Sequence, residues 1–193
     1  MLFRSLLHTP TNFYLPEVMA GLARARDAGL IKHFGVSIYE TEHALDVVSS
    51  GQVDYIQIPY NVFDQRLDKT DFFALARLNG VMVFGRAPFL QGLLFMEPDE
   101  VPQHVARAAP YLAEFVQIVK RHRLDRAEAC LQFSAAHEGI DRVVFGVDNL
   151  GQLDEDLAAV EKSPAGSCRQ ELQQCFVSME KEIIFPSLWA KPQ

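Results

Sequence analysis

His8 stands at the end of an apolar run, where a buried strand would give way to a loop. Leu6 and Leu7 lead into it, and Thr9 and Pro10 turn the chain away after it. A histidine at such a position can be a catalytic group, because its side chain titrates near neutral pH. It can also be a satisfied residue of the core, since histidine is often partly buried. This stretch alone leaves both interpretations open.

Four further apolar runs end in the same way, with polar side chains at or just after their ends. The groups are Ser37 with Tyr39, Gln57 with Tyr60 and Asn61, Arg86 with Gln91, and Asp148 with Asn149. Parallel strands of one sheet end on the same side, so these polar ends predict a shared mouth where function would gather. Turn chemistry and helix capping explain Asn149 and Ser37 as well, but they explain Gln57 poorly, because it stands between two isoleucines of a strand.

Short apolar strands alternate with amphipathic helices along the chain. Strands are expected at 4–8, 31–39, 53–60, 81–88 and 141–147, and helices at 16–29, 40–51, 68–80, 103–121, 126–137, 149–162 and 167–182. Asp125 with Glu128 predicts a capping box, and Asn149 predicts a helix cap. Strands that are continuously apolar and separated by helices predict a parallel sheet covered by helices. Because no strand is followed by GxGxxG, an open Rossmann-like sheet and a barrel both remain as alternatives.

Composition predicts one globular domain over residues 1–193, with a cytoplasmic location. The net charge of −7 argues against a nucleic-acid or anionic membrane surface. No apolar run is long enough to span a bilayer, and the start lacks the features of a signal peptide. Cys130, Cys168 and Cys175 show no CxxC spacing, so we expect reduced thiols and neither a disulfide framework nor a metal site. Cys168 and Cys175 are interpreted as packing residues on one helix face.

Five segments resemble the aldo-keto reductase family in order and spacing, from about residue 5 to 160. They are "LLHTP", "GLIKHFGVSIY", "YIQIPYNVFDQR", "GRAPFLQGLL" and "FGVDNLGQLDEDL". The resemblance implies a (β/α)8 TIM barrel that binds a nicotinamide cofactor, NAD(P)H, at the strand ends and reduces an aldehyde or ketone. It begins at what would be the fourth strand, and so implies a partial barrel covering about strands 4–8. The runs "YNVFDQRL" and "RAPFLQGLLFM" look most like a bacterial branch associated with surface sugars, which favours a sugar-derived substrate.

The resemblance also assigns roles to individual residues. His8 matches the histidine that orients the substrate carbonyl, and Ser37 and Gln57 match the residues that hold the nicotinamide carboxamide. Arg86 falls where many members place an aromatic ring against the nicotinamide. The remaining predicted cofactor contacts lie in two segments: Pro88, Phe89, Gln91 and Gly92 around the pyrophosphate, and Gly146, Asp148, Gln152 and Asp156 at the adenosine end.

The sequence departs from the family pattern at its start. The family's catalytic Asp, Tyr and Lys precede the histidine, but only "MLFRSLL" precedes His8 here. A reduced carbonyl needs a proton from an acid of tuned pKa, so we expect no reductase activity from this chain alone. Five strands would also leave open sheet edges. A partner chain or self-association could cover them, the chain could be a fragment, or the strands could form an open sheet with protected edges.

The adenosine end departs as well. Members that bind the phosphorylated cofactor hold its 2′-phosphate with basic side chains, whereas this chain has Asp148 and Asn149 there, and Asp156 where an Asn is common. A carboxylate beside a phosphate is unfavourable, so we expect the unphosphorylated cofactor to be favoured. Ile38 stands where an Asn often follows the Ser, which weakens the carboxamide clamp. The competing hypothesis is a non-catalytic half-barrel that binds a nucleotide or a partner.

Overall fold

The chain forms two compact units in the computed structural model, which describes residues 4–162 and 166–189. Unit 1 contains residues 4–59, 66–85 and 138–142. Unit 2 contains residues 60–65, 86–137, 143–162 and 166–189. Each unit is therefore built from several stretches of chain that are distant in the sequence. The single domain expected over the whole chain stays a prediction.

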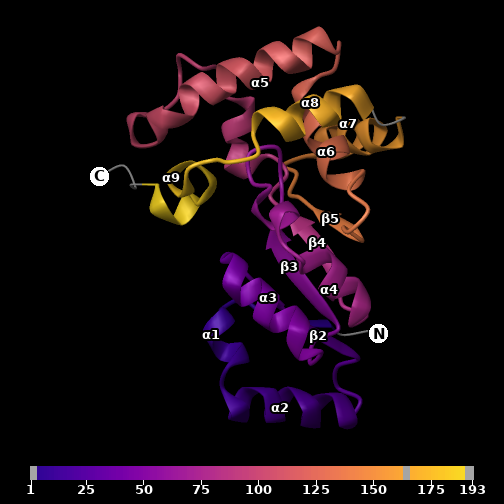
Figure 1. Ribbon diagram of the computed structural model, residues 1–193. Coiled ribbons are helices and arrows are strands. Elements are labelled where there is room, and N and C mark those ends of the chain that lie inside the picture. Colours follow the sequence, from indigo (N-terminus) through magenta and orange to yellow (C-terminus); the bar gives the residue numbers. More distant parts are fainter. Residues whose placement is uncertain (1–3, 163–165, 190–193) are drawn as a thin grey trace. The chain divides into compact units, whose positions relative to one another are not determined.

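The sheet has five strands in the order in which they occur along the chain, and the first two pairs are parallel (Figure 1). The strands are β1 (Arg4–Leu7), β2 (His33–Ser37), β3 (Tyr55–Pro59), β4 (Met82–Arg86) and β5 (Arg142–Val144). Open Rossmann-like sheets reverse their strand order at a switch point. The sequential order therefore excludes that alternative and agrees with the α/β fold of singly wound (β/α) units.

The helices of unit 1 differ in how many of their side chains are buried. They are α1 (Pro10–Phe13), α2 (Pro16–Asp27), α3 (Thr41–Ser50), η1 (Arg66–Lys69) and α4 (Phe72–Leu78). Helix α3 contacts both β3 and α4 (Figure 1). It buries Ala44, Val47 and Val48, and β2 and β3 contribute fully buried Val36 and Ile56. Helix α2 has no fully buried side chain, although Val18, Met19 and Leu22 are half-buried.

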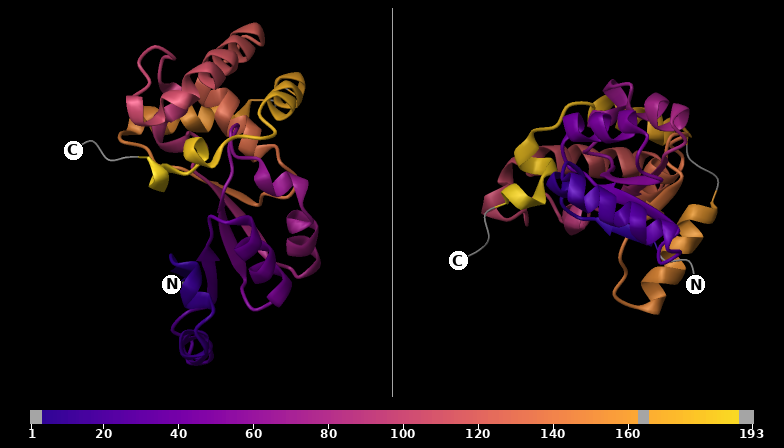
Figure 2. Two further views of the ribbon diagram at one scale, coloured as in Figure 1. Left: turned by 60° about the vertical axis from the view of Figure 1, so that its left-hand side comes forward. Right: turned by 90° about the horizontal axis from the view of Figure 1, so that it is seen from below.

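Unit 2 consists mainly of helices around an aromatic core. Its elements are η2 (Leu90–Phe95), η3 (Gln103–Ala108), α5 (Ala109–Arg121), α6 (Arg126–Ala135), α7 (Leu150–Glu161), α8 (Gly166–Cys175), α9 (Lys181–Ile184) and η4 (Pro186–Leu188). Helix α6 contacts α7 and α8, as can be followed in Figure 2. The ring of Phe63 lies 4.9 Å from that of Phe176 and 6.2 Å from that of Phe115. These buried rings hold the loop 60–65 against α5.

The predicted cap at Asn149 is confirmed, and of the predicted capping box the Asp125 half is confirmed, whereas the Glu128 carboxylate accepts hydrogen bonds from the side chains of Gln132 and Lys162. Asp125 accepts a hydrogen bond from the backbone N–H of Glu128 over 2.7 Å, and Asn149 accepts one from the N–H of Gln152 over 3.0 Å. Each side chain satisfies a backbone donor at the start of its helix.

Other predictions of local structure and packing are wrong. The single helix expected over 167–182 is divided into α8 and α9, and the intervening turn lets both Phe176 and Ile183 be buried. Cys168 is buried as expected, but Cys175 is exposed and does not pack in the core. Within residues 4–162 and 166–189, no helix combines the length and hydropathy that a membrane span requires.

Candidate functional site

Ser37 and Gln57 are direct partners in the parallel pairing of β2 with β3. The next residue, Ile38, donates its N–H to the carbonyl oxygen of Gln57 over 2.9 Å, which fixes this register. Ser37 is buried, while Gln57 is the one half-buried residue of an otherwise buried strand. Since directly paired residues point to the same face of a sheet, the two side chains form one polar pair at the strand ends.

His8 directly follows β1 at the same level of the sheet. Leu7 is paired with Val36, so the residue after it stands level with Ser37. His8 is exposed, which rules out the alternative that it is a core histidine. The structure thus brings His8, Ser37 and Gln57 to the carboxyl ends of three neighbouring strands in unit 1.

The other predicted contacts line one hollow in unit 2, with a volume of about 890 Å³. We call it the unit 2 hollow. Its lining includes every remaining predicted cofactor residue: Arg86, Pro88, Phe89, Gln91, Gly92, Gly146, Asp148, Gln152 and Asp156. Two segments that are distant in the sequence, residues 86–95 and 144–156, therefore meet at a single cavity. The role of these residues in cofactor binding stays a prediction.

Left-handed backbone angles recur in the loop from Ala87 to Gly92. Phe89 has φ −97° and ψ 2°, and the residues after it, Leu90, Gln91 and Gly92, have φ values of 47°, 56° and 83°. A residue near the right-handed region followed by a left-handed one can turn N–H groups toward an anion. In this loop, however, the N–H groups of Leu90 and Gly92 donate to the carbonyl oxygens of Ala87 and Phe89, both over 3.0 Å, and so close the turn. Arg86 adds a guanidinium to the same lining.

The part of the unit 2 hollow that residues 148–156 line is acidic, and we call it the acidic wall. Asp148, Glu155 and Asp156 line it, and among the described lining residues Arg86 is the only basic one. Burial first, and then the charges of Glu155 and Asp125, raise the pKa of Asp156 above its usual value. Sequence reasoning missed Glu155. Its spacing of three residues from Gln152 on a helix was the signal that could have found it.

Some of the predicted residues also have structural duties. The Gln152 side-chain oxygen accepts a hydrogen bond from the N–H of Asp148 over 2.7 Å, so it helps to close the start of α7. Asn61 is fully buried; it donates to the carbonyl of Ala87 over 3.1 Å and accepts from the N–H groups of Phe63 and Asp64 over 3.0 Å each. Its polar character at the strand end is therefore explained by turn chemistry.

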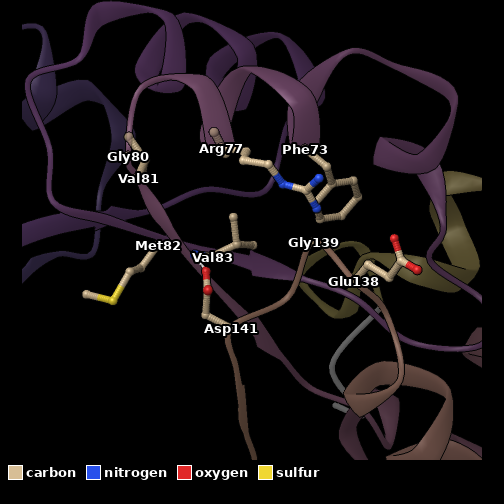
Figure 3. Close-up of a pocket in the computed structure, with 10 residues that line it drawn as sticks. Phe73, Arg77, Gly80, Val81, Met82, Val83, Glu138, Gly139 and Asp141 are labelled. Atoms are coloured by element: carbon tan, nitrogen blue, oxygen red, sulfur yellow. Dashed lines mark hydrogen bonds between the residues drawn. The ribbon is translucent and has the colours of Figure 1, made fainter.

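Unit 1 contains a smaller hollow of about 220 Å³ at the start of β4 (Figure 3). The side chains of Phe73 and Arg77 reach it from α4, and Glu138 and Asp141 reach it from the segment before β5. The carboxylate of Asp141 accepts the N–H of Val83 over 2.7 Å, which continues the sheet pairing. None of the predicted site residues lines this hollow.

A protein-family model matches most of the chain. The model described as "Aldo/keto reductase family" matches residues 6–166. The chain belongs to the aldo/keto reductase family. The match extends over all five strands from within β1 onward and over both segments that line the unit 2 hollow.

The chain is also similar to individual reductases and dehydrogenases, at sequence identities between 21% and 30%. The chain is 26% identical to L-galactose dehydrogenase of Arabidopsis thaliana over 183 residues, which are 89% of this chain and 56% of that protein. It is 30% identical over 84 residues, 42% of this chain and 26% of the relative, to NADH-specific methylglyoxal reductase of Escherichia coli. The aldo-keto reductase AKR11C1 of Bacillus halodurans shares the fold, with a TM-score of 0.73 at 21% identity over 94% of this chain and 65% of that one. The chain thus spans about half the length of its curated relatives.

The unit 2 hollow fits the pyrophosphate and adenosine parts of a nicotinamide dinucleotide, a group that the family fold implies. Its volume of about 890 Å³ lies within the usual range for ligand pockets. The guanidinium of Arg86 suits the pyrophosphate, and the carboxylates of the lining suit ribose hydroxyls. In unit 1, the amide of Gln57 and the hydroxyl of Ser37 suit a carboxamide.

Sequence reasoning places three tyrosines, Tyr14, Tyr39 and Tyr60, near the predicted mouth. Tyr39 is 39% exposed, and the other two lack the features of the family's acid. The hydroxyl of Tyr14 lies 3.4 Å from a carboxylate oxygen of Asp46, and burial and that carboxylate raise its pKa. A catalytic tyrosine needs the opposite shift. Tyr60 is buried, and its ring stacks on Phe133 and contacts His137. Tyr60 therefore belongs to the core of unit 2.

Proposed function

We propose that this chain is the carboxyl-terminal part of an aldo-keto reductase barrel, about strands 4–8, in an enzyme that reduces a carbonyl with NADH. The convergence of nine predicted cofactor residues on the unit 2 hollow is the observation that supports it most. The substrate class that we favour is a sugar-derived aldehyde or ketone. This last step rests on the resemblance of the "YNVFDQRL" segment to a branch of the family.

The chain's own residues would contribute binding and orientation. Nicotinamide, when bound, supplies the hydride. Ser37 and Gln57 would hydrogen-bond its carboxamide and so fix which face it presents, as their shared register allows. His8 is exposed beside them and would donate a hydrogen bond from its imidazole to the substrate carbonyl oxygen.

The acid that completes the reaction would come from the part of the barrel that these 193 residues do not include. A carbonyl that receives a hydride must also receive a proton, and Tyr14 and Tyr60 are unsuited to give it. We infer that these 193 residues alone are inactive and that the remaining part of the barrel carries the Asp, Tyr and Lys of the family. That part would also cover the open edges at β1 and β5, the two ends of the strand order.

Preference for the unphosphorylated cofactor follows from the acidic wall. Asp148, Glu155 and Asp156 lie where the adenosine ribose is expected, and a 2′-phosphate would meet their charges. A difference of about 1.4 kcal/mol corresponds to a factor of ten in affinity. We therefore expect NADH to bind at least about tenfold more tightly than NADPH.

The second candidate function is a non-catalytic subunit that binds a nucleotide or a partner. The unit 2 hollow supports this candidate as well, because nucleotide binding needs the lining residues but no proton donor. The two candidates differ in what happens when a polypeptide that contains the remaining part of the barrel is added. Carbonyl reduction that appears only with that polypeptide supports the first, and its absence despite cofactor binding and complex formation supports the second.

Titration of the purified chain with NADH and with NADPH, followed by nucleotide fluorescence, tests the proposal. We expect saturable NADH binding that the Asp148→Arg variant shifts toward NADPH, and no turnover of a generic aldehyde. Arg77→Ala, which alters the unit 1 hollow, serves as the matched control and should bind NADH as the wild type does. Absence of binding by folded protein, or equal affinity for both nucleotides, would contradict the proposal.

A further inference from the structure

The hollow of about 220 Å³ at the start of β4, which we call the unit 1 hollow, combines apolar surface with charges of both signs (Figure 3). The buried part of its lining is apolar and includes Ala76, Val81 and Val83. The exposed part is charged: Arg77 lines the hollow from α4, and Glu138 lines it from the segment before β5. All of these residues belong to unit 1.

The charged side chains of this lining are available to a ligand. Within residues 4–162 and 166–189, neither the guanidinium of Arg77 nor the carboxylate of Glu138 makes a hydrogen bond or an ion pair, and the two do not pair with each other. Asp141 adds a second carboxylate. One of its oxygens accepts the N–H of Val83 over 2.7 Å, and a carboxylate has room for further donors. The hollow therefore offers a cation and two acceptors for negative and positive groups of one molecule.

Close packing fixes the two walls of the unit 1 hollow. A Cβ on Gly139 would lie 2.4 Å from Cδ1 of Phe73, so this ring of α4 lies directly against the segment that carries Glu138. The N–H of Asp141 also donates to the carbonyl oxygen of Val83 over 2.9 Å, which ties that segment to β4. A ligand would thus meet a formed site, and binding would cost little ordering of the backbone.

We propose that the unit 1 hollow binds a small aliphatic zwitterion, namely a free amino acid with an apolar side chain. The planar guanidinium of Arg77 matches a carboxylate, and the carboxylates of Glu138 and Asp141 accept hydrogen bonds from an ammonium group. The aliphatic side chain would cover the apolar lining. The volume lies below the usual range for ligand pockets, about 300–1,000 Å³, which restricts the occupant to a small molecule.

The exposure of the charges explains why one molecule must carry both. A single ion pair at an exposed site contributes little to binding. A second charged group on the same molecule reaches its partner at high effective concentration, so the two contacts reinforce each other. None of the predicted cofactor residues lines the unit 1 hollow, so the proposal is independent of the proposed function.

Three matched ligands test the proposal with the full chain. They are L-leucine, isocaproate, which is leucine without its ammonium group, and isoamylamine, which is leucine without its carboxylate. We expect calorimetry to show saturable binding of leucine and binding at least about tenfold weaker of either single-charge ligand. Backbone NMR signals of residues 76–83 and 138–141 should shift on addition of leucine.

The variants Arg77→Gln and Glu138→Gln each remove one charge from the lining. Each should weaken leucine binding at least about fivefold, because each breaks a charge-assisted contact. Both side chains are exposed, so the variants should fold, and circular dichroism checks this. The matched controls Arg24→Gln and Glu42→Gln remove exposed charges of unit 1 that do not line the hollow, and they should bind leucine as the wild type does.

Absence of saturable leucine binding by folded wild-type protein would overturn the proposal. So would equal affinities for leucine and for either single-charge ligand, since the hollow would then be a simple anion or cation site. Leucine binding by Arg77→Gln and Glu138→Gln that equals that of the controls would overturn it as well. NADH titration of the same proteins reports on the cofactor site, so failure of the zwitterion site and failure of the proposed function are distinguishable.

Discussion

The guanidinium of Arg126 donates a hydrogen bond to the carbonyl oxygen of Phe95 over 2.8 Å and so joins the start of α6 to the rim of the unit 2 hollow. The same group reaches the carbonyl of Met96 over 3.0 Å and the carboxylate of Glu97 over 2.6 Å. Its side chain is only 19% exposed. The ring of Phe95 lies 4.9 Å from that of Phe89, so Arg126 holds one aromatic wall of the hollow in place.

Replacement of Arg126 by alanine should therefore weaken nucleotide binding although Arg126 does not line the hollow. The substitution removes three hydrogen bonds that the charged guanidinium donates, and these bonds hold residues 95–97 against the start of α6. We expect a loss of about 1–3 kcal/mol in the free energy of unfolding and an NADH affinity lower by about fivefold. Urea unfolding and fluorescence titration measure the two effects.

Arg107→Ala supplies the comparison. Arg107 also pairs with a carboxylate, that of Glu180 at 2.9 Å, but the two side chains are 70% and 45% exposed. Such a surface pair contributes less than about 1 kcal/mol. If both substitutions had equal effects on NADH affinity, the positioning role given to Arg126 would be wrong.

Gly35→Ala should disturb the pairing that places Ser37 opposite Gln57. A Cβ at position 35 would lie 2.2 Å from the carbonyl oxygen of Tyr55, which is backbone of the neighbouring strand. We expect destabilisation by about 2 kcal/mol or more, because a backbone atom cannot turn aside.

The matched substitution is Gly21→Ala in α2, where the nearest atom to the new Cβ is at 3.9 Å. Alanine favours a helix over glycine by about 0.5–1 kcal/mol, so this variant should be as stable as wild type or more so. Thermal unfolding of the two variants separates the effect of close approach from that of backbone freedom. A Gly35→Ala protein as stable as wild type would refute the tight β2–β3 contact.

Acid should loosen the contact between α5 and α8. Glu171 of α8 lies 2.7 Å from Nε2 of His122 and also pairs with Arg121. The hydrogen bond with His122, together with the positive charge of Arg121, lowers the pKa of Glu171 below its ordinary value of 4.5. A carboxyl group with a lowered pKa stabilises the fold above that ordinary value, and the stabilisation is lost as the pH falls through the pKa of the folded state.

Comparing the free energies of unfolding of wild type and of Glu171→Gln as a function of pH should reveal this contribution. At neutral pH the variant should be less stable than wild type, and the two proteins should converge as the pH falls below the lowered pKa of Glu171 in the folded state, as measured by urea unfolding from neutral to acidic pH. Glu180→Gln, which alters an exposed pair, should follow the wild-type curve more closely. A constant difference between wild type and Glu171→Gln at every pH would contradict the assignment.

Sequence reasoning succeeded where the deciding chemistry is local. Asp125 and Asn149 cap their helices because a short acceptor beside a helix start meets a free N–H within three residues. The strands were found because each is a short apolar run between helical segments, and β2 and β3 are buried on both faces as such runs predict, whereas β4 alternates and the ends of β5 are exposed. The arrangement of Ser37 and Gln57 was accessible for the same reason, since parallel strands end on one side.

It failed where several elements decide together. Cys175 lies seven residues after Cys168, yet one is exposed and the other buried, because exposure depends on what neighbouring elements cover. The left-handed backbone of Leu90 and Gln91 is not written in their side chains, since most non-glycine residues avoid it. Glu155 lines the acidic wall because residues of α7 and residues 86–95 line one hollow, and the sequence does not show that these two segments meet.

Helix α2 has no fully buried side chain, although Val18, Met19 and Leu22 are half-buried. Its local opening therefore exposes less apolar surface than the opening of α3 would, and we expect the free energy of that opening to lie below that of global unfolding. Amide hydrogens of residues 16–27 should exchange with solvent earlier than those of α3, whose Ala44, Val47 and Val48 are buried. Unit 1 thus contains a gradient of local stability that rises from its first long helix toward β2 and β3.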